Sequence, residues 1–592
     1  MIGLPAARAV YLDGLHGAVF GMFHEPAAQA SSDTAVILCS PWGWDEVASY
    51  RSRRVWAEDL ARAGFPVMRF DFPGTGDSSG APTDSALLDG WSAAIDRAVT
   101  AMREMTGCLR MAVIGLGAGG LAAGHAIGQG VVVDDLVLWA TPTRGRAFTR
   151  ELRAFATLQV NREEPEDPQG LPTREGRLEA GGFVLTAETI EALDAVALDR
   201  SSTGTLRRAL LLERDGIAVD RHLREHLEAG GVEVTLAAGN GWAAMATDIE
   251  RSEPPTTVFA TVTSWLRLAA GPGPVPHLRT SPEVAHAELP AGRDRIRESA
   301  FTLTADGVRL FGVLSEPCGA RTSDRCAVFL NAGAIRRIGP NRLWVEAARR
   351  AAANGIPAVR VDLEGIGDSD GDGQVYADVR QFYRPVLGTQ VRAILDHLEG
   401  RGLGHVFTLI GLCSGAYWAF EAAQHEDRVE AAVLFNPRAL VWDPHLQTRR
   451  QARALRNVRD RATWRRLVRG HISLKRVIAV ARAGARHAWW TTTARSPRPV
   501  NAVLAALDVL RDRGTRIVLA FGDNEELQTE LDEHGLFQRL DRWPNVGFVR
   551  LPGADHTVRP SAAQRRVLAL LDEELARPCR PDGRSAGTLE HA

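Results

Sequence analysis

The chain has 592 residues, which is too long for one hydrophobic core, so we expect at least two domains. Hydrophobic residues make up 45% and charged residues 24% of it, as in a globular protein, and a net charge of −2 argues against nucleic-acid binding driven by a global field. No stretch has the character of a signal peptide or a bilayer span, so we expect a cytoplasmic protein without stable membrane insertion.

The cysteine pattern indicates free thiols. No CxxC pair or Cys/His cluster has the spacing of a zinc site, and we predict no metal and no cofactor. The six cysteines are Cys39, Cys108, Cys318, Cys326, Cys413 and Cys579.

Two long stretches of the chain repeat one another. AGFPVMRFDFPGTGDSSG in the first half aligns with NGIPAVRVDLEGIGDSDG in the second. Gly74 pairs with Gly365, an offset of 365 − 74 = 291, and the turn residues Asp13 and Asp306 give 306 − 13 = 293. Two matches at nearly one offset predict a diverged tandem repeat.

Each half alternates strands with helices, which is typical of a mostly parallel sheet covered by helices on both faces. We predict one such domain over 1–268 and another over 299–578. The Pro- and Gly-rich stretch 269–298 reads as a linker, and 579–592 as a disordered tail.

The first half contains a strand followed by GLGAG, with Gly117 where a nucleophile would stand. Asp215 follows a later strand, and Trp242 aligns with a histidine of the second half. Nucleophile and base are both missing, so we expect no acyl-enzyme chemistry here. His222 and His226 are four residues apart, but we see no third ligand and prefer an exposed charged helix.

In the second half, the strand 406–410 leads into GLCSG and then into a helix, the pattern of a nucleophile elbow centred on Cys413. A thiolate in this position is a strong nucleophile. The alternative is a small buried cysteine in a site that has lost its serine. Oxyanion donors are expected from the backbone of Ser414 and of Gly333 or Ala334.

Two further groups would complete a triad in the order nucleophile, acid, histidine. DNEEL follows the strand 516–522, and its spacing favours Glu525 over Asp523 as the acid, without deciding between them. PGADH follows the strand 547–551 and places His556 in the last loop before a C-terminal helix.

A basic insertion lies between the predicted strands 429–437 and 516–522. We expect residues 438–500 of this insertion to form a cap above the candidate site. Residues 444–498 contain 15 Lys and Arg but one acid, Asp460, with tryptophans interleaved. A solvated helical face would explain this pattern. Coenzyme A or an acidic acyl carrier protein would also fit it, whereas nucleic acid would not, because the basic region is confined. The candidate binding residues are Arg449, Arg465, Arg466, Arg469 and Trp464.

The second half resembles the α/β-hydrolase superfamily, and more narrowly the exosortase-system-associated and serine-aminopeptidase-like hydrolases. The strings NAGAIRRIGPNR, VRVDLEGIGDSDG, GLCSGA and PGADH carry the resemblance, which covers most of 299–577. The first half resembles the same superfamily through FPVMRFDFPGTGDSSG, GLGAG and LLERD. The resemblance implies two tandem α/β-hydrolase domains. Most members have serine where Cys413 stands, so ester hydrolysis does not carry over directly.

We therefore predict acyl transfer, or thioester or ester hydrolysis, through an acyl group on Cys413, with His556 as base and Glu525 orienting it. A simple esterase is one alternative. A non-catalytic scaffold or carrier-binding protein is another, and a peptidase has little beyond family naming to support it. The acyl group, the acceptor, the role of the first half and the oligomeric state stay open.

Overall fold

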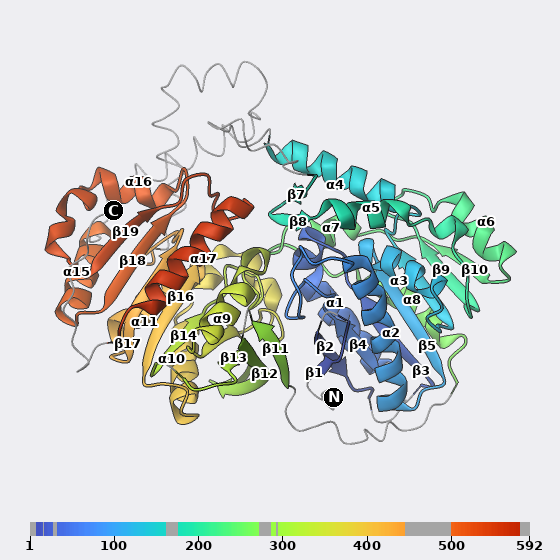
Figure 1. Ribbon diagram of the computed structural model, residues 1–592, viewed down its shortest axis with the longest axis horizontal. Helices are drawn as coiled ribbons and strands as arrows, with labels where there is room; N and C mark the ends of the chain where they lie inside the picture. Colours follow the sequence, from blue (N-terminus) through green and yellow to red (C-terminus); the bar gives the residue numbers. More distant parts are fainter. Residues whose placement is uncertain are drawn as a thin grey trace, which may run out of the picture.

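The computed structural model describes residues 7–15, 17–27, 32–160, 176–271, 286–291, 294–321, 323–443 and 499–579. Two helix-flanked sheets lie side by side, one built by the first half of the chain (blue to green) and one by the second (yellow-green to red) (Figure 1). The prediction of an α/β fold with helix-flanked sheets is confirmed. No helix of the described part is both long and apolar enough to cross a membrane.

The first sheet has, within the described residues, the strand order β1-β2-β4-β3-β5-β6-β9-β10. Strands β1 and β2 run antiparallel to their neighbours, and the pairs from β4 onward are parallel. The strands are β1 (Arg8–Leu12), β2 (Val19–His24), β3 (Thr34–Cys39), β4 (Val67–Phe70), β5 (Arg110–Leu116), β6 (Asp135–Trp139), β9 (Arg208–Leu212) and β10 (Glu233–Ala237).

Eight α-helices and one short hairpin accompany this sheet in the described residues. The hairpin consists of β7 (Leu178–Ala180) and β8 (Phe183–Leu185). The helices are α1 (Trp44–Arg62), α2 (Leu87–Thr106), α3 (Ala118–Gly128), α4 (Gly145–Val160), α5 (Ala187–Ala195), α6 (Arg221–Ala229), α7 (Trp242–Ala246) and α8 (Thr256–Arg267).

The second sheet has the order β11-β12-β13-β15-β14-β16-β17-β18-β19 in the part of the chain that the structure describes. Without β11, this order matches the first sheet position by position, as a tandem repeat requires. The strands are β11 (His286–Ala291), β12 (Asp294–Ala305), β13 (Val308–Pro317), β14 (Arg325–Phe329), β15 (Ala358–Asp362), β16 (Val406–Leu412), β17 (Val429–Phe435), β18 (Arg516–Phe521) and β19 (Val546–Arg550).

The helices of the second half lie on both faces of its sheet. Its core strands are fully buried, as strands covered on both sides must be. The described helices are α9 (Leu343–Ala353), α10 (Pro385–Gly400), α11 (Ser414–His425), α15 (Pro499–Asp512), α16 (Glu526–Glu533) and α17 (Ser561–Ala576).

The predicted linker 269–298 is too long at its C-terminal end. Residues 286–291 form β11, which pairs with β12 from residue 294 onward. Leu289 and Ile296 are buried together against Ala352 of α9, so this segment has an apolar pattern that its Pro and Gly content concealed. The hairpin extends the second sheet by one edge strand.

Equivalent residues of the two halves exchange ion pairs where the halves meet. Arg69 lies 2.8 Å from Asp368, and Arg360, which is 360 − 69 = 291 residues later, pairs with Asp77. The two aspartates are also 368 − 77 = 291 residues apart, and all four side chains are buried. Reciprocal contacts of this kind are what a twofold axis produces between identical subunits. The two halves therefore pack as the subunits of a symmetric dimer do.

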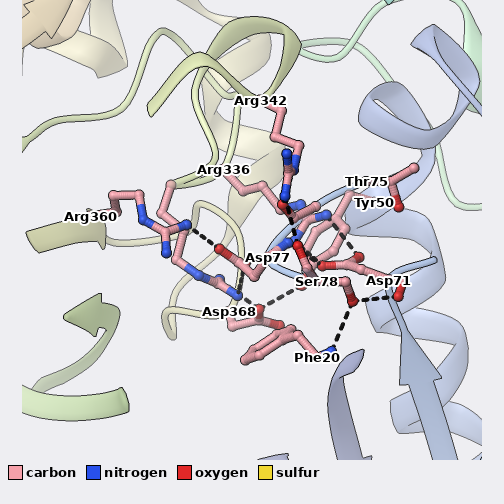
Figure 2. A network of polar contacts seen from close by, with 12 residues as sticks. Phe20, Tyr50, Asp71, Thr75, Asp77, Ser78, Arg336, Arg342, Arg360 and Asp368 are labelled. Carbon is pink, nitrogen blue, oxygen red and sulfur yellow. Dashed lines mark hydrogen bonds and ion pairs between the residues drawn. The ribbon is translucent and has the colours of Figure 1, made fainter. Parts of the chain in front are cut away.

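The loop after β14 is held by both halves (Figure 2). Arg336 lies 2.9 Å from Asp71 and 3.1 Å from Glu46, both in the first half. Arg337 lies 2.7 Å from Asp77 of the first half and 2.8 Å from Asp368 of the second. Buried charges are stable only when they are paired, so the first half fixes the position of this loop.

Candidate active site

Cys413 occupies a strained bend between β16 and α11. Its φ of 58° and ψ of −113° lie in a region that residues with a side chain rarely adopt. A Cβ on Gly411 would come within 2.2 Å of Gly415, and one on Gly415 within 2.4 Å of the Asn331 carbonyl oxygen. Only glycine fits at these two positions, which explains the Gly-x-Cys-x-Gly spacing.

His556 connects Cys413 to Glu525. Its Nδ1 lies 3.0 Å and 3.2 Å from the two carboxylate oxygens of Glu525, and the imidazole and the Cys413 thiol lie close enough to shift each other's pKa. Glu525 is buried at the start of α16, and His556 lies in the loop after β19. The three groups thus come from the ends of three strands of one sheet.

The electrostatics of the site favour a thiolate–imidazolium pair. Burial opposes ionisation of Cys413, but the hydrogen bond and charge of His556 and the charge of Arg438 lower the pKa of the thiol. Burial likewise opposes protonation of His556, but its contacts with Cys413 and Glu525 raise the pKa of the imidazole to about 9. A lowered thiol pKa is what a nucleophilic cysteine requires.

The two predicted acids have different partners. Glu525 faces the imidazole, whereas Asp523 Oδ2 accepts a hydrogen bond of 2.7 Å from the backbone N–H of Gly553. Asp523 therefore fastens the start of the histidine loop. The sequence spacing left both open, and the geometry brings only Glu525 to His556.

Asn436 holds the other side of the same loop, and sequence reasoning missed it. Its side-chain N–H groups donate to the carbonyl oxygens of Asp555 at 3.1 Å and His556 at 3.0 Å. Its Oδ1 accepts from the N–H of Gly522 at 2.7 Å. The sequence offers only an asparagine directly after an apolar strand as a signal, and the structure shows it buried with a φ of 43°.

Arg438 is a second site residue that was missed. Its Nε lies 3.2 Å from His556 Nε2. A protonated His556 has no lone pair on Nε2, so in the thiolate–imidazolium state the Arg438 N–H must turn away from the ring. The positive charge of Arg438 lowers the pKa of Cys413 and so favours the thiolate.

The predicted oxyanion loop differs in detail from expectation. The N–H of Gly333 donates to the hydroxyl of Ser414 at 3.1 Å, so the Ser414 side chain points toward this loop and occupies that donor. Of the predicted oxyanion donors, the backbone N–H groups of Ala334 and Ser414 remain as candidates.

In the first half, the bend equivalent to Cys413 has a glycine and lies against a tryptophan ring. Gly117 has a φ of 52° at the equivalent bend, and a Cβ there would lie 3.5 Å from the ring of Trp242, which is buried. Asp215 accepts backbone hydrogen bonds from Gly241, Trp242 and Ala243 at 2.5–3.2 Å. The acid of this half therefore binds the loop that in the second half carries a histidine.

The predicted histidine pair of the first half lies away from this site. His222 and His226 are on α6, where His226 Nε2 contacts the Ser201 carbonyl oxygen at 2.7 Å. Among the described residues, no group of three or more His, Cys, Asp or Glu could hold a metal ion. The predicted cap residues Arg449, Arg465, Arg466, Arg469 and Trp464 lie outside the described residues.

Comparison with protein families gives one match. Residues 327–570 match the model of the alpha/beta hydrolase family. A search of the curated proteins found no match.

Solved structures similar to this chain include several hydrolases. A dienelactone hydrolase from Anabaena variabilis is 16% identical over 47% of this chain and 96% of its own, with a TM-score of 0.31. An esterase from an Arctic intertidal metagenomic library is 16% identical over 48% and 97%, with a TM-score of 0.29. A proline iminopeptidase from Mycobacterium smegmatis is 15% identical over 47% and 99%, with a TM-score of 0.31. Similarities this weak carry no information about activity.

The family match covers the second half of the chain and stops short of the first. The part that contains Cys413, Glu525 and His556 is therefore the part that has the sequence pattern of the alpha/beta hydrolase family.

Proposed function

We propose that the protein is a tandem pair of α/β-hydrolase domains in which the second forms an acyl-enzyme on Cys413 and the first has lost its own chemistry. The observation that carries this proposal is the chain of contacts from Cys413 through His556 to Glu525. The family match over residues 327–570 supports a hydrolase in general.

The proposed acylation step uses the three groups of the candidate site. The Cys413 thiolate attacks the carbonyl carbon of a thioester or ester, and a C–S bond forms while the carbonyl oxygen becomes an oxyanion. Backbone N–H groups at Ser414 and Ala334 bind that oxyanion. The bond to the leaving group then breaks, and the leaving thiol or alcohol takes the proton held on His556 Nε2.

Deacylation reverses the roles. His556 takes a proton from water, an alcohol, a thiol or an amine, which attacks the acyl carbon. The C–S bond breaks, and the thiolate and imidazolium are restored. Glu525 stabilises the charged imidazole in both steps.

The acyl donor is a separate part of the proposal. Coenzyme A or an acyl carrier protein would suit a basic cap, and this rests on the composition of residues 444–498 alone. A simple esterase, with water as the acceptor, is supported equally well by the family match. The narrower resemblance to exosortase-associated hydrolases is supported by sequence motifs alone.

Acyl-adduct formation tests the proposal. The protein is incubated with acyl thioesters of N-acetylcysteamine of several chain lengths, and its intact mass is measured. We expect one acyl group per chain, lost in Cys413→Ala and retained in Cys318→Ala, which removes an exposed thiol. The absence of an adduct with every donor would contradict the proposal and favour a non-catalytic scaffold.

Product analysis separates the two enzymatic candidates. A carboxylic acid as the only product, with amines and alcohols also present, would identify an esterase or thioesterase. A new amide, ester or thioester would identify a transferase.

A further inference from the structure

A segment of the first half lies against the candidate site of the second. Residues 247–252 follow α7 and are tied to α1, because Trp44 Nε1 donates to the Thr247 carbonyl oxygen at 3.3 Å and Arg51 donates to that of Ser252. Ile249 packs on the same apolar cluster as Cys413. The segment is thus held beside the thiol by contacts in its own half.

Glu250 extends from this segment into the site. Its Oε1 is 3.4 Å from the position that a Cβ on Gly333, in the loop after β14, would take. Its charge acts on Cys413, His556 and Arg438. A residue of the half without a nucleophile therefore lies against the loop after β14, near enough for its charge to reach the thiol.

The Glu250 carboxylate is partly buried and has no close partner among the described residues. Within the described part of the chain, no hydrogen bond or ion pair engages its side-chain oxygens, and only its backbone N–H is bonded, to Asp248. Burial and the neighbouring Asp248 raise its pKa, although Arg438, Arg251 and His556 oppose the shift.

The position of this carboxylate is unfavourable for the resting site. Its charge disfavours the Cys413 thiolate, and its own burial costs free energy. Groups that are unfavourable at rest gather at binding sites, where a ligand compensates them. A cation from the substrate would compensate Glu250.

We propose that Glu250 binds a primary ammonium group of the substrate, so that the first half selects what the second half acylates or releases. This inference rests on the proposed acyl-enzyme. Two sources of the ammonium group share this chemistry: an amine that accepts the acyl group, or an amino group carried by the acyl donor.

An amine acceptor must lose two protons from its ammonium form. Glu250 takes one proton from the ammonium ion and later releases it to solvent. The free amine attacks the acyl carbon, and a C–N bond forms. His556 takes the second proton from nitrogen and retains it as the C–S bond breaks, which restores the Cys413–His556 pair. The products are an amide, the free enzyme and one proton in solution.

The test compares charged with neutral substrates. In the acceptor arm, the acetyl thioester of N-acetylcysteamine is offered with butylamine or butanol. In the donor arm, the thioester carries a 4-aminobutyryl group or its N-acetylated form. The readout in each arm is the ratio of kcat/KM for the amine-containing reaction to that for its neutral counterpart.

Three proteins are compared: the wild type, Glu250→Gln and Glu253→Gln. Glu253 is exposed three residues further on, so its variant removes the same charge without touching the site. Loss of one charge-assisted contact should lower the ratio about tenfold or more in Glu250→Gln, and Glu253→Gln should keep the wild-type ratio. The arm in which the ratio falls identifies the source.

The outcomes distinguish this inference from the proposed function. A wild-type protein that forms no Cys413 adduct would overturn both. Adduct formation with the same ratio in all three proteins would overturn the inference alone. An equal fall in Glu253→Gln would also overturn it, because the effect would then be one of overall charge.

Discussion

The same bend is present in both halves of the chain, but the space above it differs. In the second half, Cys413 faces His556, which is oriented by Glu525. In the first half, Gly117 faces the buried ring of Trp242. The first half thus has no nucleophile at the bend, and a tryptophan where the second half has its histidine.

The first half keeps the fold of the second, although its bend has no nucleophile, and its acidic residues contact other groups. Its acid, Asp215, binds backbone N–H groups of the loop with Trp242. Its carboxylates Asp71 and Asp77 anchor Arg336 and Arg337 in the loop after β14, which also contains Ala334. The first half therefore holds a loop that borders the candidate site of the second.

The strongest effect is expected at His556, and its equivalent in the first half, Trp242, serves as the comparison. We expect His556→Ala to lower kcat with an acyl thioester by roughly 10²–10⁴-fold, because the thiol loses its base. Trp242→Ala changes the matching position of the first half and should leave kcat within a few-fold of wild type. Steady-state kinetics checks both, and an equal fall in the two variants would erase the functional distinction between the halves.

The next effect concerns the contact between the halves. Arg337 is buried between Asp77 and two carboxylates of its own half, so Arg337→Ala should lower the free energy of unfolding by about 3–5 kcal/mol. Arg295→Ala, which removes a largely exposed arginine paired with Glu288, should cost about 0–1 kcal/mol. Urea unfolding measures both. A negligible loss in Arg337→Ala would mean that the network does not hold the halves together.

The smallest effect comes from restoring a thiol to the first half. Gly117→Cys places a side chain at a φ of 52°, close to that of Cys413, and should cost about 1–3 kcal/mol of stability. It should not form an acyl adduct in a Cys413→Ala background, because Trp242 occupies the place of the base. Intact-mass measurement decides this, and an adduct at position 117 would show that the first half keeps a working site.

Local patterns in the sequence predict much of the fold and the bend. The repeat at an offset of 291 and the spacing of GLCSG anticipated two related sheets and the position of Cys413. Such features can be recognised in a sequence because each requires a backbone geometry that only certain residues allow.

Contacts between distant segments were beyond the reach of the sequence. Asp523 and Glu525 follow the same strand, and only the packing of the histidine loop separates their partners. Glu250 comes from the other half of the chain, and no local pattern connects it to Cys413. The hairpin at 286–298 was missed because its Pro and Gly content outweighed its short apolar pattern.

The pKa of Cys413 shows directly whether His556 activates this thiol. Alkylation by iodoacetamide is followed against pH in a chain that lacks the exposed Cys318 and the partly exposed Cys579, with site-specific detection of modified Cys413. Since a lowered pKa keeps the thiolate at more acidic pH, the midpoint should lie below the ordinary thiol value of roughly 8.5. It should move upward in His556→Gln, which has no imidazolium. A wild-type midpoint at or above the ordinary value, unchanged in His556→Gln, would contradict the account.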